Sequence, residues 1–153
     1  MSRSRTIYYD HARGSDEQPA FPQGEAGSVI VESDGSWSSE TEVQIGPNSH
    51  CALIHHGVAD ELTALPDARG HAGSGRDLLL PPGSAEAAAG IFYEADRKTY
   101  GARYDFLALA QEIPEAIHYR IAIDNREYQQ TLSQLQFLST TAGRHGRGLR
   151  IRL

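Results

Sequence analysis

The sequence predicts a mainly β, single-domain protein, a β-sandwich or jelly-roll barrel that carries one C-terminal amphipathic helix and a terminal strand. Short runs rich in β-branched and aromatic residues recur with turn signals at roughly ten-residue intervals, which is typical of sandwiches and barrels. Helical periodicity occurs only near the C-terminal end. A length of 153 residues suits one hydrophobic core better than two.

The expected division of the single domain, 1–153, follows composition. Residues 1–27 form an N-terminal strand and an extended arm, 28–123 form the β body, and 124–153 form the helix and the terminal strand. The N-terminal strand is predicted at residues 6–10. The body opens with a hairpin around the turn Ser-Asp-Gly-Ser, between strands at 28–32 and 40–45. Trp37, just after that turn, is expected to plug the core or line a rim.

Further strands are expected at residues 50–58, 62–65, 78–80, 90–94, 104–110 and 117–123. If 50–58 is extended, side-chain alternation sends His55 and His56 to opposite faces. A bulge or turn at Gly57 would then be needed to bring both rings to one metal ion.

The C-terminal helix is predicted at residues 125–142. Asp124 is its expected cap, with Glu127 three residues later as in a capping box. An apolar stripe runs along one face, made of Tyr128, Leu132, Leu135, Leu138 and Ala142. Phe137 lies opposite this stripe, so it is expected to face outward and to serve subunit association or another protein contact. A terminal strand follows at 149–152.

Charge is unevenly distributed along a chain whose net charge is -6. Residues 120–153 hold six arginines against two acids, whereas 14–119 hold 5 basic and 17 acidic residues. The arginine-rich tail either binds phosphate or pairs with the acidic body of this or a neighbouring subunit. The net negative charge favours pairing and argues against nucleic acid as a partner.

The sequence shows no feature of a membrane or secreted protein. No apolar run approaches the roughly 18 residues that span a bilayer, and no secretory signal follows the basic N-terminus. Cys51 is the only cysteine, so no intrachain disulfide can form, and the cytoplasm is the expected compartment. A thiol nucleophile at Cys51 with His118 or His55 as base is a possible but poorer catalytic reading, because a lone cysteine in an apolar run is usually inert.

Two segments carry a resemblance to a known family. Residues 55–61 read His-His-Gly-Val-Ala-Asp-Glu, and 75–86 read Gly-Arg-Asp-Leu-Leu-Leu-Pro-Pro-Gly-Ser-Ala-Glu. Together they resemble the two conserved segments of cupins, although the family spaces its first histidines as His-x-His and ends the second segment with histidine.

The resemblance implies a barrel with a divalent metal, Mn, Fe, Ni or Zn, at its mouth. The ligands carried over are His55, His56, Glu61 and Glu86, a nitrogen and oxygen set that suits these metals. Arg76 between the two glutamates is the metal-free alternative.

Two functional hypotheses therefore stand. The first is a cupin-like domain that binds a small molecule or a divalent metal, with enzymatic activity left open. The second is a non-catalytic structural or interaction module, such as a subunit of a homo- or hetero-oligomeric assembly. The sequence does not identify a substrate.

Overall fold

A computed structural model describes residues 5–10, 23–73, 75–111 and 117–153, with side chains described at 23–73, 75–107 and 121–153. Its strands are β1 (Arg5–Asp10), β2 (Gly24–Val31), β3 (Trp37–Ser39), β4 (Val43–Ile45), β5 (Asp77–Leu80), β6 (Tyr104–Gln111), β7 (Ile117–Asp124) and β8 (Gly148–Arg152). Its helices are α1 (Pro47–His55), α2 (Val58–Thr63), α3 (Pro82–Lys98) and α4 (Asn125–Arg144).

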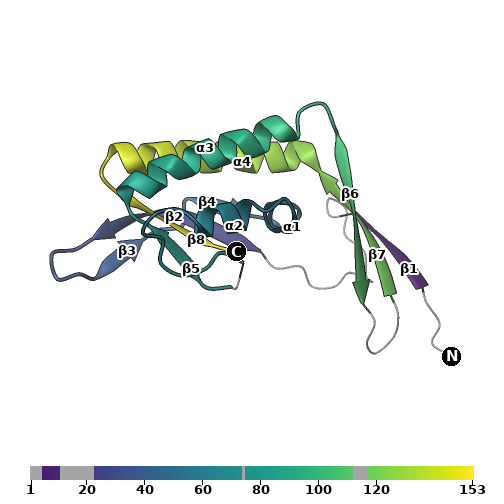
Figure 1. Cartoon of the computed structure of the whole chain (residues 1–153), viewed down its shortest axis with the longest axis horizontal. Helices are drawn as coiled ribbons and strands as arrows, with labels where there is room; N and C mark the ends of the chain where they lie inside the picture. The colour runs from purple at the N-terminus through teal and green to yellow at the C-terminus, as the bar shows by residue number, and fades with distance from the viewer. Residues whose placement is uncertain (1–4, 11–22, 74, 112–116) are drawn as a thin grey trace.

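The strands form two open sheets (Figure 1). The larger sheet has the order β3-β2-β8-β5, with β4 on the same edge of β2 as β3, and its strand pairs are antiparallel. The smaller sheet has the order β1-β7-β6, with β1 parallel to β7, and projects from the body like an arm. Neither sheet closes on itself.

Helices α3 and α4 lie side by side over one face of the larger sheet, while α1 and α2 pack beside them (Figure 1). The two long helices approach each other closely at Gly143, where an added Cβ would come within 2.8 Å of the Cβ of Glu86. A side chain at this position would push the helices apart. The start of α3 therefore packs against the end of α4, so the pair is antiparallel.

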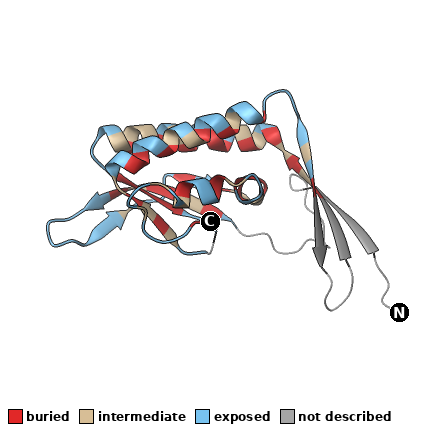
Figure 2. Cartoon of the chain, viewed as in Figure 1, coloured by how far each residue is buried: buried red, intermediate tan, exposed pale blue. Residues whose placement is uncertain are grey.

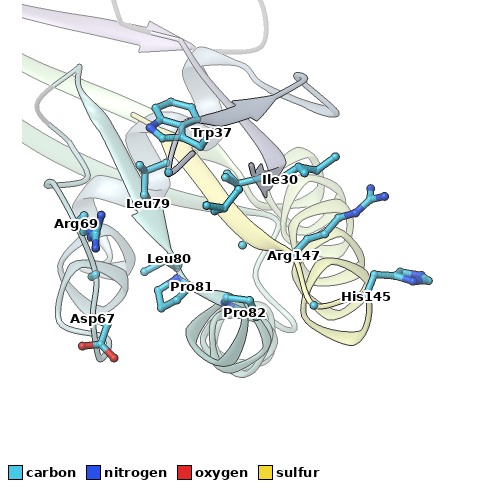
Figure 3. Close-up of a pocket in the computed structure, with 16 residues that line it drawn as sticks. Ile30, Trp37, Asp67, Arg69, Leu79, Leu80, Pro81, Pro82, His145 and Arg147 are labelled. Carbon is cyan, nitrogen blue, oxygen red and sulfur yellow. The ribbon is translucent and has the colours of Figure 1, made fainter. Parts of the chain in front are cut away.

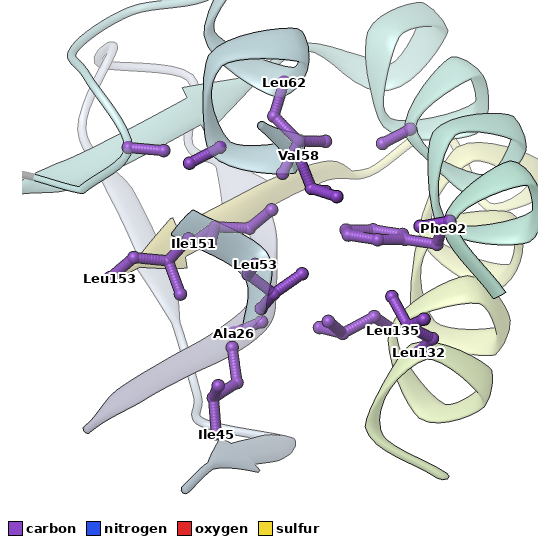
Figure 4. Packing of buried hydrophobic residues seen from close by; sticks show 14 of the residues in the cluster. Ala26, Ile45, Leu53, Val58, Leu62, Phe92, Leu132, Leu135, Ile151 and Leu153 are labelled. Carbon is purple, nitrogen blue, oxygen red and sulfur yellow. The ribbon is translucent and has the colours of Figure 1, made fainter. Parts of the chain in front are cut away.

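The hydrophobic core fills the space between the helices and the sheet, and their buried sides face each other (Figure 2). Phe92 from α3 and Leu132 from α4 point toward Leu53 and Ile151 (Figure 4). The base of the projecting sheet belongs to the same hydrophobic cluster through three buried side chains, Leu107, Ile121 and Ile123. Burial of such side chains contributes about 1.5–3 kcal/mol each.

The opposite face of the larger sheet carries a buried arginine. Arg150 is only 5% exposed, and its guanidinium donates to Glu25 Oε1 at 2.8 Å and to Ser39 Oγ at 2.5 Å. Arg152 on the same strand donates from Nε to Asp77 Oδ1 at 3.0 Å. The guanidinium of Arg150 holds the pKa of the Glu25 carboxyl below its ordinary value, with help from the Thr41 hydroxyl. These two tail arginines therefore pair with acids of the body.

The predicted fold class is wrong, because the protein is mixed α/β with open sheets and four helices in its described part. The predicted strands at 50–58, 62–65 and 90–94 are instead parts of α1, α2 and α3. The predicted all-β sandwich or jelly roll is therefore wrong, and so is the barrel mouth that the cupin resemblance implied.

The physical reason lies at two proline-marked helix starts. Pro47 and Pro82 occupy the first turns of α1 and α3, where a missing N–H costs nothing and a fixed φ favours the helix. In α3 the buried residues Ala85, Ala88 and Phe92 recur at helical spacing. Short apolar runs fit strand and helix equally well, so the prolines were the distinguishing signal.

The other predicted elements are present. The strands expected at 6–10, 78–80, 104–110, 117–123 and 149–152 correspond to β1, β5, β6, β7 and β8. The first hairpin is also found, with its second strand divided into β3 and β4. The predicted helix is α4, and Asp124 caps it by accepting from the N–H of Arg126 at 2.9 Å. The arm was expected to reach residue 27, but its last four residues, 24–27, belong to β2, and 11–22 lie outside the described residues.

Candidate functional site

Three of the four proposed metal ligands lie around one small cavity of about 310 Å³, which we call the histidine pocket. It is lined by His55, His56, Val58, Glu61, Ala95 and Lys98. The left-handed turn at Gly57, with φ of 78°, joins α1 to α2 and brings the two histidines and Glu61 together. The fourth residue, Glu86, lies elsewhere, beside Gly143.

The histidine pocket is not arranged as a metal centre. Among the described residues, no group of three or more His, Cys, Asp or Glu side chains is placed to hold a metal ion. His56 instead pairs with Asp105, 3.6 Å from Nε2 to the carboxylate, and packs edge-on against the ring of Tyr128. Burial lowers the pKa of His56, an effect that Asp105 opposes. The predicted four-ligand metal site is therefore corrected, because its residues are not brought together, while the binding of a divalent metal stays a prediction.

Cys51 and Tyr128 also fail to provide a nucleophile. Burial raises the pKa of the Cys51 thiol, the opposite of what a thiolate nucleophile requires. Burial also raises the pKa of Tyr128, whose hydroxyl has no hydrogen-bond partner among the described residues. Neither group is poised to lose a proton near neutral pH.

A larger cavity of about 820 Å³ opens at one end of the larger sheet, and we call it the sheet-end groove (Figure 3). It exists because β8 begins at Gly148, opposite Val29, whereas β2 continues to Val31 before it turns into β3. In the described part of the chain, no strand therefore lies between β2 and β5 at this end of the sheet. Pro81 and Pro82 at the start of α3 form another wall of the groove.

The walls of the sheet-end groove are mainly apolar. The large side chains that line it are Ile30, Val31, Trp37, Leu79, Leu80, Pro81 and Pro82. Ile30 and Trp37 are each 43% exposed and Val31 is 67% exposed. Apolar side chains gathered in a concave surface at this level of exposure are typical of binding sites.

Basic side chains stand at the edges of the same groove. Arg69 and Arg147 line it together with His145, against a single acid, Asp67. Figure 3 shows Trp37, Leu79 and Arg69 on one side, with Arg147 and His145 on the other. Neither arginine side chain forms an ion pair or a hydrogen bond with another described residue. Both guanidinium groups are free to bind an anion.

No protein family, curated protein or solved structure matches this chain. Among the described residues, no helix is long and apolar enough to cross a bilayer. A function is therefore inferred from the geometry of the groove.

The groove residues could not be identified from the sequence, because they come from segments that are distant along the chain. Trp37 was expected as a core plug or rim residue, and its exposure fits the rim. The arginines of the C-terminal tail have two different surroundings. Arg150 and Arg152 pair with acids, while Arg147 lines the groove. Nothing in the sequence near Arg69 marks it as a partner of Arg147.

Phe137 faces outward as predicted, and it is 75% exposed on α4. It does not line the sheet-end groove or the histidine pocket. Its proposed part in subunit association remains a prediction.

Proposed function

We propose that this protein is a non-catalytic binding module whose sheet-end groove holds an elongated apolar ligand bearing a negative charge. The observation that carries the proposal is a cavity of about 820 Å³ with a mainly apolar lining and two arginines that have no ion-pair partner among the described residues. This function belongs to the interaction-module class and involves no metal.

Charge supports an anionic ligand. In a chain of net charge -6, acidic side chains are abundant, and Arg150 and Arg152 each have carboxylate partners. Arg69 and Arg147 stand apart from these acids at the groove. A ligand carboxylate or sulfonate at either arginine would form charge-assisted hydrogen bonds, which are stronger than neutral ones.

The apolar walls support the rest of the ligand. Trp37 offers a broad ring face on one side, and Ile30 and Leu79 add aliphatic surface. Covering such surface contributes roughly 25 cal/mol for each Å² removed from water. The groove therefore favours a ligand that is both apolar and anionic over one that is only charged.

The groove lacks the groups needed for catalysis in its own lining. Its titratable side chains besides arginine are Asp67 and His145, and Figure 3 shows them on separate sides. No serine, threonine, cysteine or lysine lines it, so no nucleophile and base pair is present among its described lining residues. Binding is the chemistry this arrangement supports.

The test uses anilinonaphthalene sulfonate, a fluorescent probe that combines aromatic rings with a negative charge. We expect saturable binding to the wild-type protein, weakened about five- to tenfold in both Arg147→Ala and Arg69→Ala, because each change removes a charge-assisted contact. Arg97→Ala, an exposed arginine of α3 outside the groove, serves as the matched control. Nile red, which is neutral, should bind all four proteins equally.

Two results would reject the proposal. One is the absence of saturable probe binding to the wild-type protein. The other is equal affinity of the sulfonate probe for the wild-type protein and the two groove variants, because the arginines would then play no part.

A further inference from the structure

The main chain of Val31 lies at an unpaired strand edge inside the sheet-end groove. Val31 stands opposite Trp37 in the β2–β3 hairpin, and the next residue, Glu32, receives its hydrogen bond from the other strand at Ser36, 2.7 Å from N to O. Hydrogen-bonded and non-hydrogen-bonded pairs alternate in an antiparallel ladder. Val31 and Trp37 are therefore a non-hydrogen-bonded pair.

It follows that the N–H and C=O of Val31 point away from β3, toward the side on which β8 pairs with β2. The β8 pairing ends at Val29 and Gly148, two residues before Val31. Outside the strand ladders, no main-chain hydrogen bond among the described residues involves Val31. One donor and one acceptor are thus exposed to the groove where a continuation of β8 would lie.

The side chains around this edge are sorted onto two faces. Val31, Trp37 and Leu79 stand on the face of the sheet that also bears Arg150, because their register positions share its alternation. Ile30 stands on the opposite face, on the side of the groove where Figure 3 shows Arg147 and His145. A strand lying beside Val31 would present alternate side chains to these two faces.

We infer that the ligand of the sheet-end groove is an extended polypeptide segment of a partner protein, which adds as a strand beside β2 in line with β8. The residue opposite Val31 would be apolar and contact Trp37 and Leu79. Its neighbours would be acidic and reach toward Arg147. This inference rests on the proposed function of the groove and adds the class of its ligand.

An extended segment fits better than a compact anion for a physical reason. A compact anion can satisfy an arginine but leaves the donor and acceptor of Val31 to water, whereas a peptide satisfies both groups and the apolar wall together. Strand addition draws affinity from main-chain hydrogen bonds and specificity from alternate side chains. The short free edge at Val31 predicts a weak complex in the micromolar range.

The experiment measures binding of a fluorescein-labelled peptide, Glu-Val-Glu-Val-Glu, by fluorescence anisotropy. We expect wild-type protein to bind it and to bind Lys-Val-Lys-Val-Lys at least about tenfold more weakly, because the groove edges are basic. Val31→Pro removes the N–H that faces the groove. Because that N–H points away from β3, its removal breaks no hydrogen bond of the folded protein. This variant should weaken peptide binding about tenfold.

A second arm uses only wild-type protein and modified peptides. N-methylation of both valines removes the donors that face β2 and should abolish binding. N-methylation of the glutamates instead removes donors that face away from β2, and should weaken binding far less. This arm decides the question even if Val31→Pro alters folding.

The outcomes separate the inference from the proposed function. Equal peptide affinity of Val31→Pro and wild type, or no difference between the two methylated peptides, overturns strand addition. Failure of the peptide to bind a wild-type protein that binds the sulfonate probe also overturns it, and the proposed function stands. Failure of the probe itself to bind removes the proposed function.

Discussion

Replacement of Arg150 by methionine is the sharpest test of how the larger sheet is held together. The guanidinium contacts Glu25, Asp77 and Ser39 in a site where Arg150 is 5% exposed. Breaking a buried ion pair from one side costs about 3–5 kcal/mol, because the remaining charges lose their partner. Arg152 remains 3.0 Å from Asp77 and 3.6 Å from Glu25, so we expect the lower end, about 3 kcal/mol.

Urea unfolding followed by circular dichroism measures this loss. With a slope of about 2 kcal/mol per M, the midpoint of Arg150→Met should fall by about 1.5 M. The melting temperature should fall by about 6–12 °C. Arg152→Met is the matched control, because its side chain is 47% exposed and exposed pairs contribute less than about 1 kcal/mol. Equal destabilisation by the two variants would refute the reasoning.

Two further predictions concern acid stability and association. The pKa of Glu25 is lowered in the folded protein from an ordinary value of 4.5, so its ionised form stabilises the fold above that pH and the contribution is lost as pH falls through the lowered pKa. Glu25→Gln should therefore reduce stability at pH 7 and flatten its decline below about pH 4.5, as measured by urea midpoints across pH; an unchanged acid profile would contradict this. Phe137→Asp should shift the sedimentation coefficient toward monomer while Gln130→Asp, an exposed control on α4, does not, and equal values for both would reject association through Phe137.

The sequence was most informative where a local signal and long-range packing agree. Asp124 and the apolar stripe beginning at Tyr128 specify α4 by capping and periodicity, and both operate within a few residues. Similarly, the turn around Gly35, a left-handed glycine with φ of 85°, specifies the first hairpin. These elements could be predicted because nothing distant in the chain competes with them.

The sequence-based prediction was wrong where a short apolar run could bury one face either as a helix or as a strand. Residues 47–55 include Ala52 and Leu53, which are buried against the core as a helix but would serve equally in a strand. Pro47, which opens α1, also stands just after the strand predicted at 40–45, where a proline would equally fit the end of a strand. Because residues 58–63 and 82–98 are helices, Glu61 lies beside the two histidines on α2 whereas Glu86 lies on α3 beside Gly143, so the four proposed ligands do not form one set.

The candidate site could not be predicted from local sequence. Its free edge at Val31 depends on β8 beginning at Gly148, which is more than a hundred residues away. The approach of Arg69 and Arg147 to one groove depends on the sheet order β2-β8-β5. Both facts are properties of the assembled sheet.

The central claim, that the sheet-end groove is the binding site, is tested most directly by following amide and indole chemical shifts by NMR during titration with anilinonaphthalene sulfonate. We expect the largest saturable changes at Val31, Trp37 and Arg147, which line the groove. Largest changes at His56 and Glu61 in the histidine pocket, or no saturable change at any amide, would contradict this claim.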